Sequence, residues 1–416
     1  MKIELAYGKT YMPVEIPDKN VMGVLEPNDV KVELTGEAEV KRALGEPIDS
    51  KRLKDIVSPG EKVCIITSDI TRPLPSKYVV PHVIDELVAG GVSEDDIFVI
   101  FGLGNHRPQT EEEMIYLVGE ETYNRVKCYD SDPNDLIQLG VTEMGTPVDI
   151  TRRVCEADKR VCIGNVEYHY FAGYSGGAKA IMPGVSSHAA IQSNHSRMVL
   201  DTARAGLIDG NPVRKDIDDV ADFISIDFIV NVVLDEKKNI INAAAGHYIS
   251  AHRKACAFLD TLYKIEIPER ADIVIVSPGG YPKDINVYQA QKALDNAKHA
   301  VKKGGIIIWA GACTEGLGEE VFENWMLSAD CSQSLVDRIQ REFELGGHKA
   351  AAIAMVLCDS RIFFVSDFED EFVESIFLEP KPDIQTALES AFDILGKDAG
   401  VIVMPYGGST LPHAAE

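Results

Sequence analysis

The densest group of side chains able to do chemistry lies in a glycine-rich segment near the middle of the chain. This segment, Tyr168 to Val185, reads YHYFAGYSGGAKAIMPGV and follows an apolar run. It brings an imidazole, His169, and an amine, Lys179, together with glycines that permit backbone conformations of positive φ. Turns of this composition often bind anions through backbone N–H groups, so the segment is predicted to be a phosphate cradle.

Two other interpretations compete with this one. The glycines could serve only a tight strand-to-helix turn, with Lys179 a solvated side chain. A Walker phosphate loop is excluded, because Ala178 stands where the second glycine belongs and Ala180 where a serine or threonine would hold Mg²⁺. If the segment binds a ligand, Lys179 therefore has a different role from the Walker lysine.

Two other strand ends carry polar side chains. Asp69 and Arg72 follow the apolar run 63–67, in a turn where Pro73 suits the first position of a helix. Arg72 could clamp a carboxylate with its planar guanidinium, or pair with Asp69 inside the turn. His106 follows the next apolar run, and its ordinary pKa suits proton transfer near neutrality, although loop histidines are often only hydrogen-bonded.

Residues 187–195 are predicted to form a helix that carries two histidines. His188 and His195 would lie two turns apart on one face. At 1.5 Å per residue they are about 10 Å apart along the axis, too far to share one metal ion. Only one of them is therefore predicted to be a metal ligand.

A second polar helix is predicted over residues 284–294, with Asp284 as its N-cap. Tyr288, Gln289 and Lys292 would occupy one side of it. This side is either a binding surface or a solvated polar face, and the pattern alone fits both interpretations.

An α/β fold of two domains, with parallel-type sheets covered by helices, is predicted from the apolar pattern. Short β-branched runs alternate with helical patterns, and such continuous runs are typical of strands buried on both faces. Polar or glycine-rich segments follow several of them, where parallel strands end and such folds bind ligands. The runs span residues 63–67, 97–101, 161–163, 228–233, 273–276, 306–309 and 401–404.

A charged segment with a helix breaker, Lys264 to Arg270, indicates the domain boundary. Residues 1–265 are predicted to form a larger amino-terminal α/β domain and residues 266–416 a smaller one, with the carboxyl-terminal tail free to return to the first domain. The active site is expected in the cleft between the domains.

Composition narrows the classes of partner. The 416 residues carry a formal net charge of −25, which disfavours nucleic acid and anionic membranes. The eight cysteines are scattered without a C-x-x-C pair, so neither a disulfide framework nor a thiolate metal site is indicated. No apolar stretch approaches the roughly 18 residues of a membrane span, and Met1 to Leu5 begin no signal segment, so a cytoplasmic protein is expected.

Taken together, these segments resemble the family of nickel-pincer-dependent lactate racemases and 2-hydroxyacid racemases over nearly the whole chain. The resemblance implies a nickel-pincer nucleotide: a pyridinium mononucleotide with thioamide and thiocarboxylate groups, joined covalently to Lys179. His195 would supply the fourth nickel ligand, a role that suits imidazole. The motifs that carry the resemblance are SDITRP from Ser68, GNHRP from Gly104, the Tyr168–Val185 segment, Asn194-His195 and YQAQK from Tyr288.

The resemblance also implies a reaction. A 2-hydroxyacid gives its hydroxyl proton to a base and a hydride to the cofactor, and the planar 2-ketoacid is then reduced from its other face. His106 and His169 match the two bases, since neutral imidazoles can alternate as base and acid. Enzymes that build the cofactor are implied partners, and the small hydroxyacid is the implied substrate.

The remaining site residues follow from the same resemblance. Arg72 would orient the substrate carboxylate, while the polar helix of the second domain would close on the substrate. The nucleotide would be seated by Asp69 and by a group of backbone amides in the glycine-rich segment. The substrate-binding residues of the second domain are Tyr288, Gln289 and Lys292, and the amides are those of Ser175, Gly176 and Gly177.

One departure from the family concerns substrate choice. Some lactate-acting members carry a tryptophan near the position where residues 347–352 of this chain read GHKAAA, and the tryptophans here are Trp309 and Trp325. A roomier pocket is therefore expected, in which His348 or Lys349 meets a second polar group. Malate, a longer hydroxyacid or an aldonate would then be candidate substrates beside lactate.

Two other functions compete with the racemase. A non-catalytic protein that binds the nucleotide or nickel cofactor would need the cradle but not two bases, so His106 and His169 weigh against it. A pyridine-nucleotide dehydrogenase would need a G-x-G-x-x-G turn after residues 63–67, and none follows.

Overall fold

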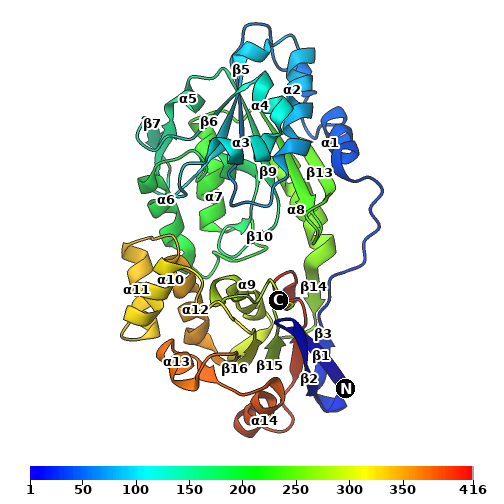
Figure 1. Ribbon diagram of the computed structural model, residues 1–416, viewed down its shortest axis with the longest axis vertical. Helices are drawn as coiled ribbons and strands as arrows, with labels where there is room; N and C mark the ends of the chain where they lie inside the picture. Colours follow the sequence, from blue (N-terminus) through cyan, green and yellow to red (C-terminus); the bar gives the residue numbers. More distant parts are fainter. Residues whose placement is uncertain (415–416) are drawn as a thin grey trace. The chain divides into compact units, whose positions relative to one another are not determined.

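The computed structural model describes residues 1–414 and divides into two compact units. The central unit is Val30–Asp260, and the terminal unit combines Met1–Asp29 with Thr261–Glu416. Each unit is built around a six-stranded sheet with helices, as expected for an α/β fold (Figure 1). No helix among residues 1–414 is long and apolar enough to cross a membrane.

The division differs from the predicted split at residue 265. Residues 1–29 fold with the carboxyl-terminal part because β3 (Val21–Val24) pairs in parallel with β19 (Val401–Met404). The segment predicted as the boundary contains a strand, β14 (Lys264–Ile267), which pairs with β20 (Leu411–Ala414). The carboxyl-terminal tail up to residue 414 therefore stays with the terminal unit. Pairing between the two ends of the chain leaves no local signal in the sequence.

The sheet of the central unit has the order β13-β12-β9-β4-β5-β6, and only the β12–β13 pair is antiparallel. Helices α1 (Gly36–Gly45) and α2 (Val80–Ala89) cover one face, where Val40, Leu44, Val83 and Leu87 join the core of the sheet. The strands are β4 (Val63–Ser68), β5 (Ile97–Gly102), β6 (Lys127–Asp130), β9 (Lys159–Asn165), β12 (Phe228–Leu234) and β13 (Ile240–Gly246).

The order of strands in this sheet creates a topological switch point. From β4 the chain adds β5 and β6 on one side, and it later places β9 on the other side of β4. Open α/β sheets bind ligands at the carboxyl ends of the strands where the order reverses. Here Asp69 follows β4, and the glycine-rich segment follows β9 as β10 (Tyr168–His169), β11 (Gly173–Tyr174) and the 3₁₀ helix η5 (Gly177–Ala180).

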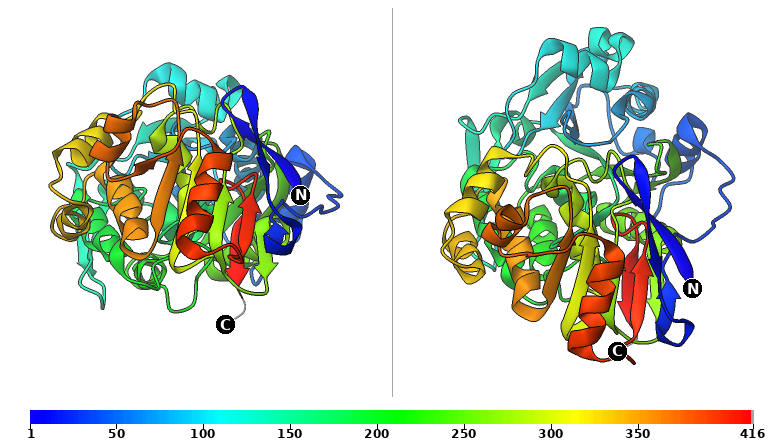
Figure 2. Two further views of the ribbon diagram at one scale, coloured as in Figure 1. Left: turned by 90° about the horizontal axis from the view of Figure 1, so that it is seen from below. Right: turned by 60° about the horizontal axis from the view of Figure 1, so that its bottom comes forward.

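The sheet of the terminal unit has the order β18-β17-β16-β15-β19-β3, with every pair parallel. Helix α14 (Ile384–Leu395) and the hairpin of β1 (Lys2–Tyr7) and β2 (Thr10–Glu15) pack on the core of this sheet. Figure 2 shows the blue amino-terminal hairpin beside the red carboxyl-terminal strands. The other strands are β15 (Ala271–Val276), β16 (Val301–Ala310), β17 (Arg361–Val365) and β18 (Glu379–Pro380).

All seven predicted apolar runs are strands, but two predicted helix starts are wrong. Asp284 does not cap a helix, because its carboxylate accepts the backbone N–H groups of Gly8 and Ala312. The cap of α9 (Val287–Ala297) is Asn286, which accepts the N–H of Gln289 at 2.9 Å. Pro73 lies in a loop ahead of the first helical turn, which begins at residue 76.

Candidate active site

Two of the predicted site residues form a direct pair at the carboxyl ends of β4 and β5. His106 Nδ1 lies 2.7 Å from Asp69 Oδ2, and the Thr71 hydroxyl donates to the other carboxylate oxygen at 2.7 Å. Burial raises the pKa of the Asp69 carboxyl, but the hydrogen bond and the charge of His106 outweigh burial and hold that pKa below its ordinary value. Because a carboxylate only accepts, His106 donates its Nδ1–H, and neutral His106 keeps its lone pair on Nε2.

Arg72 does not form an ion pair with Asp69 within the turn in the described part of the chain. Its guanidinium is exposed, and only its backbone N–H bonds to the Asp69 carbonyl, at 3.2 Å. The charge of Arg72 nevertheless helps to lower the pKa of Asp69, although by less than the contacts with His106 and Thr71. Arg72 therefore stays accessible for a carboxylate ligand.

His169 and His195 flank one aromatic ring. The ring centroid of Phe171 lies 4.5 Å from that of His169 and 4.9 Å from that of His195, edge-on in both pairs. His169 comes from β10 and His195 from the last residue of α6 (His188–His195), which confirms the helix predicted over residues 187–195 and has Ser187 as its N-cap. Phe171 thus fixes the spacing of these two imidazoles.

The tautomer of His169 is the opposite of that of His106. His169 Nδ1 accepts the backbone N–H of Ala172 at 3.3 Å. Neutral His169 therefore carries its proton on Nε2. One candidate base thus offers a lone pair at Nε2 and the other offers a proton there.

Positive charge gathers around these rings although the chain is strongly acidic. Burial lowers the pKa of His169 well below its ordinary value, and the charges of Lys179 and His195 lower it further. Burial also lowers the pKa of Lys179, with repulsion from Arg214 and Arg72 adding to the effect. Lys179 as a whole residue is half-buried, and desolvation of its amino group disfavours the protonated form. A lowered pKa increases the neutral, nucleophilic fraction of an amine.

Two buried basic side chains hold the carbonyl groups of the glycine-rich segment. Arg214, on α7 (Pro212–Asp219), is 1% exposed and donates to the carbonyl oxygens of Ala172 and Tyr174. His252, on α8 (Tyr248–Tyr263), is fully buried and donates from Nε2 to the Ser175 carbonyl at 2.8 Å. The segment is therefore fixed by side chains that lie far from it in the sequence.

The three amides predicted to seat a phosphate differ in availability. The N–H of Ser175 donates to the Glu167 carbonyl at 2.9 Å, and that of Gly177 donates to Asn231 Oδ1 at 2.9 Å. Within residues 1–414, the N–H of Gly176 has no hydrogen-bond acceptor. An anion at this turn is therefore expected to bind Gly176 first, because the other two amides would have to exchange a protein partner.

Replacing the buried guanidinium should destabilise the protein. We expect Arg214→Met to lower the free energy of unfolding by about 3 kcal/mol or more, because several buried carbonyls lose a charged donor at once. Urea denaturation followed by circular dichroism measures the loss. The control is Lys215→Ala, which removes a half-exposed ion pair on the same helix and should change stability by less than about 1 kcal/mol. Equal effects of the two substitutions would contradict the structural role of Arg214.

A metal ion could take only part of its coordination from this chain. Residues 1–414 contain no group of three or more His, Cys, Asp or Glu side chains placed to hold one. His188 is exposed and pairs with Asn105, whereas His195 is 7% exposed beside the basic cluster. A metal ion at His195 would therefore receive one imidazole from the described residues and its other ligands from another molecule.

The predicted substrate-binding residues of α9 belong to the terminal unit. Gln289 and Lys292 are exposed, and Tyr288 is half-buried. Lys349, on α12 (Gly347–Asp359), is 7% exposed; its amine lies 3.8 Å from the centroid of the Tyr288 ring and donates to the Tyr288 carbonyl. Lys349 thus ties α12 to the start of α9.

Gly347 lies in the segment where some family members carry a tryptophan, and in this structure it contacts a tryptophan from another helix. A Cβ on Gly347 would lie 2.2 Å from the ring of Trp325, which comes from α10 (Glu320–Ser328). The Trp325 indole donates to Glu344 at 2.7 Å. His348 is buried and accepts the N–H of Gly346 on Nδ1 at 3.0 Å. A roomier substrate pocket therefore remains a prediction.

Four residues that shape the site were missed at the sequence level. Phe171 lies inside the glycine-rich segment. The signal available in the sequence was an aromatic residue that follows His169 closely. Arg214, Asn231 and His252 lie in otherwise ordinary helix and strand patterns, so their burial against the glycine-rich segment leaves no local mark.

Comparison with known proteins identifies relatives over the full length. A family model for the lactate racemase N-terminal domain matches residues 7–206, and one for the lactate racemase C-terminal domain matches residues 267–411. A lactate racemase of Thermoanaerobacterium thermosaccharolyticum is 35% identical, with 98% of each chain covered. A lactate racemase of Lactiplantibacillus plantarum is 32% identical over 97% of this chain and 98% of its own.

Solved structures give the same picture of the fold. The lactate racemase apoprotein from T. thermosaccharolyticum superposes with a TM-score of 0.87 at 34% identity, covering 99% of this chain and 100% of that one. A protein from Thermotoga maritima superposes with a TM-score of 0.63 at 20% identity, over 92% of this chain, and shows likeness of fold alone.

Proposed function

The chain belongs to the lactate racemase family, and from this premise we propose that it is a nickel-dependent racemase of 2-hydroxyacids, with lactate as the first candidate substrate. A racemase is an isomerase, so the protein is placed in that class of enzyme. The proposal covers the reaction, the nickel-pincer nucleotide and the roles of individual residues.

The observation that supports this reaction best is the opposite tautomers of two histidines. Inversion at C2 needs one group that removes the hydroxyl proton and another that returns a proton after reduction from the other face. Asp69 leaves neutral His106 with a lone pair on Nε2, and Ala172 leaves neutral His169 with a proton there. The base becomes an imidazolium when it takes the hydroxyl proton, and the proton donor must start as an imidazolium so that it ends as a neutral imidazole. A protein that only binds a nucleotide has no need of two such groups.

The cofactor assignment is supported by the donors of the central unit. A thioamide bond requires an unprotonated amine, and the pKa of Lys179 is depressed by burial and by Arg214. His195 offers an imidazole, and the surrounding cations suit an anionic nucleotide. When bound, the nickel-pincer nucleotide supplies a site that accepts a hydride from C2 and returns it.

The chain's own residues would bind the substrate and move its proton. Arg72 is exposed and suited to a bidentate bond with the substrate carboxylate. His106 Nε2 takes the hydroxyl proton as C2 loses its hydride, which leaves a 2-ketoacid. His169, as its imidazolium, then donates the Nε2 proton to the carbonyl oxygen as the hydride returns to the opposite face; the enantiomer results and His169 is left neutral. The reaction regenerates the cofactor and consumes no other reactant.

The direct test uses protein coexpressed with the enzymes that build the cofactor. Intact mass spectrometry should show an adduct relative to the apoprotein, and elemental analysis should find nickel with it. Chiral chromatography should show interconversion of D- and L-lactate, with malate and an aldonate assayed in parallel. Loaded protein that leaves every one of these acids unchanged would contradict the racemase and favour a cofactor-binding protein.

Removing the polar groups of α9 should weaken substrate use without affecting the cofactor. In the double variant Gln289→Ala/Lys292→Ala we expect kcat/KM to fall by at least about 10-fold, the scale of one lost charged hydrogen bond. Adduct mass and nickel content should match the wild type. The control is Lys298→Ala, a substitution at the carboxyl-terminal cap of α9, where the amine pairs with Asp295. Unchanged kcat/KM in the double variant would remove α9 from the substrate site.

A further inference from the structure

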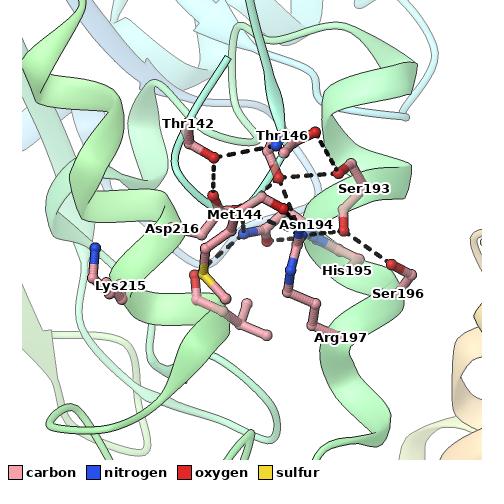
Figure 3. Close-up of polar contacts among 12 residues, drawn as sticks. Thr142, Met144, Thr146, Ser193, Asn194, His195, Ser196, Arg197, Lys215 and Asp216 are labelled. Carbon is pink, nitrogen blue, oxygen red and sulfur yellow. Dashed lines mark hydrogen bonds and ion pairs between the residues drawn. The ribbon is translucent and has the colours of Figure 1, made fainter.

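His195 stands at the end of a buried hydrogen-bond network that its proposed role alone does not require. The carboxylate of Asp216, on α7, is fully buried and accepts the Thr146 hydroxyl at 2.6 Å and the Asn194 amide at 2.9 Å. The Thr142 hydroxyl donates to its other oxygen. Asn194 in turn contacts His195, so that carboxylate, amide and imidazole form a chain (Figure 3).

The neighbours of Asn194 fix which way its amide points. Its Nδ2 lies 2.9 Å from Asp216 Oδ2 and 3.2 Å from the Val213 carbonyl oxygen, and both of these atoms can only accept. The NH₂ group must therefore face them, and the amide oxygen must face His195. That oxygen lies 3.0 Å from His195 Nδ1 and can only accept a hydrogen. His195 Nδ1 therefore carries a proton, and a neutral His195 has its lone pair on Nε2.

We propose that Asp216 and Asn194 are positioning residues that lock His195 in the Nδ1–H tautomer and so present Nε2 as the metal ligand. The metal-binding half of this statement rests on the proposed function, whereas the tautomer does not. Metal-binding histidines commonly donate their second ring N–H to an oxygen, which fixes the ring and strengthens the metal bond. Here the oxygen belongs to an amide whose own orientation is set by a buried carboxylate.

The surroundings of Asp216 explain why the chain keeps one arrangement. Two threonine hydroxyls and the Asn194 amide occupy its oxygens, and Arg197 Nη1 lies 3.5 Å away with the balancing charge. A flipped Asn194 would point its oxygen at the carboxylate, two acceptors face to face, and leave its NH₂ against the ring. The network thus penalises the tautomer that would protonate Nε2.

A purely structural role for the network, tying α6 to α7, predicts loss of stability but no change of tautomer. The two roles can therefore be separated in the apoprotein. Two-bond ¹H–¹⁵N correlation spectra of protein labelled with ¹⁵N-histidine report which ring nitrogen is protonated, and His195→Gln assigns the signal. We expect wild-type His195 to be in the Nδ1–H form.

Exchanging the two partners gives the sharpest comparison. In Asp216→Asn, the new amide can offer its NH₂ to Asn194, so that only the Val213 carbonyl still opposes a flip of the Asn194 amide, and the share of the Nε2–H form of His195 should rise. In Asn194→Asp/Asp216→Asn, the carboxylate at 194 accepts from His195 and from the new amide but loses the bond to the Val213 carbonyl, and the Nδ1–H form should return. The control is Ser193→Ala, which removes a hydroxyl bonded to Thr146 but leaves Asn194 its partners and should keep the wild-type tautomer.

The second measurement is the nickel affinity of protein that carries the cofactor adduct. Asp216→Asn should hold nickel 10- to 100-fold more weakly in a chelator competition, while the adduct on Lys179 keeps its mass, and the double exchange should recover most of that affinity. An Nε2–H form in the wild type, or one tautomer throughout the series, would overturn the proposal. Wild-type protein that takes up no adduct would instead contradict the proposed function and leave the tautomer result standing.

Discussion

Lys179→Ala is expected to abolish the covalent mass increment and, with it, all racemase activity. Lys179 carries the amino group that is desolvated beside the glycine-rich turn, and burial with the charges of Arg214 and Arg72 lowers its pKa. A protonated lysine cannot form a thioamide, so this environment favours attachment at neutral pH. Intact mass spectrometry of coexpressed protein, followed by peptide mapping of residues 173–185, measures the outcome.

The variant should remain folded. Removing a cation from a positive cluster relieves repulsion, so Lys179→Ala apoprotein should melt at or above the wild-type temperature. Lys179→Arg is the matched control, because it keeps the charge but cannot be acylated at neutral pH, and it should lose the adduct as well. An adduct of unchanged mass in either variant would place the attachment on another residue.

The strands that position the site were predictable because their signal is local. Continuous β-branched runs mark buried parallel strands, and several of these runs end in a turn that carries a candidate site residue. The helix predicted over residues 187–195 was confirmed as α6, with Ser187 as its cap. The assignment of residues 1–29 was not, because β3 pairs with β19 across nearly the whole chain and no periodicity reports such a partner.

Contacts between distant segments also explain the two local errors. Asp284 and Asn286 are both good helix caps, and the sequence does not rank them. In the fold, the Asp284 carboxylate is bonded to the amides of Gly8 and Ala312, so Asn286 takes the cap. Arg214 likewise lies in a helix whose charged sequence predicts a solvent-exposed position. Tertiary packing nevertheless buries Arg214 against the glycine-rich segment.

The sequence indicates candidate site residues, but it does not indicate the pairs that they form. The resemblance assigned Asp69 to the nucleotide, whereas its carboxylate bonds to His106. Parallel register decides this contact, since Ser68 of β4 lies opposite Gly102 of β5 and the turns that follow them become neighbours. A position that follows from strand register cannot be read from either turn alone.

The pairing of Asp69 with His106 leads to the second large effect. We expect His106→Ala to lower kcat in both directions by on the order of 10²–10⁴-fold, the usual contribution of a positioned general base. His169→Ala should do the same, since each direction uses both imidazoles. Lactate interconversion by chiral chromatography, with adduct mass and nickel measured on the same samples, separates lost chemistry from lost cofactor.

Asp69→Asn tests how His106 is activated. Thr71 donates its hydroxyl to one oxygen of Asp69, so an asparagine would keep its oxygen there and turn its NH₂ toward His106 Nδ1. His106 would then accept at Nδ1 and hold its proton on Nε2, where it could no longer take one from the substrate. We therefore expect kcat to fall by on the order of 10²-fold or more with the adduct intact.

The double variant Asp69→Asn/His106→Ala decides between the two roles of Asp69. If the carboxylate acts through His106, the double variant should be no slower than His106→Ala alone, because the second substitution removes nothing further. If Asp69 instead seats the nucleotide, Asp69→Asn should reduce adduct and nickel, and its effect should multiply with that of His106→Ala. If the two substitutions lower kcat by multiplying factors and the adduct and nickel content falls, Asp69 binds the nucleotide. If the double variant is as active as His106→Ala alone and carries the full adduct and nickel, Asp69 and His106 act together in proton transfer.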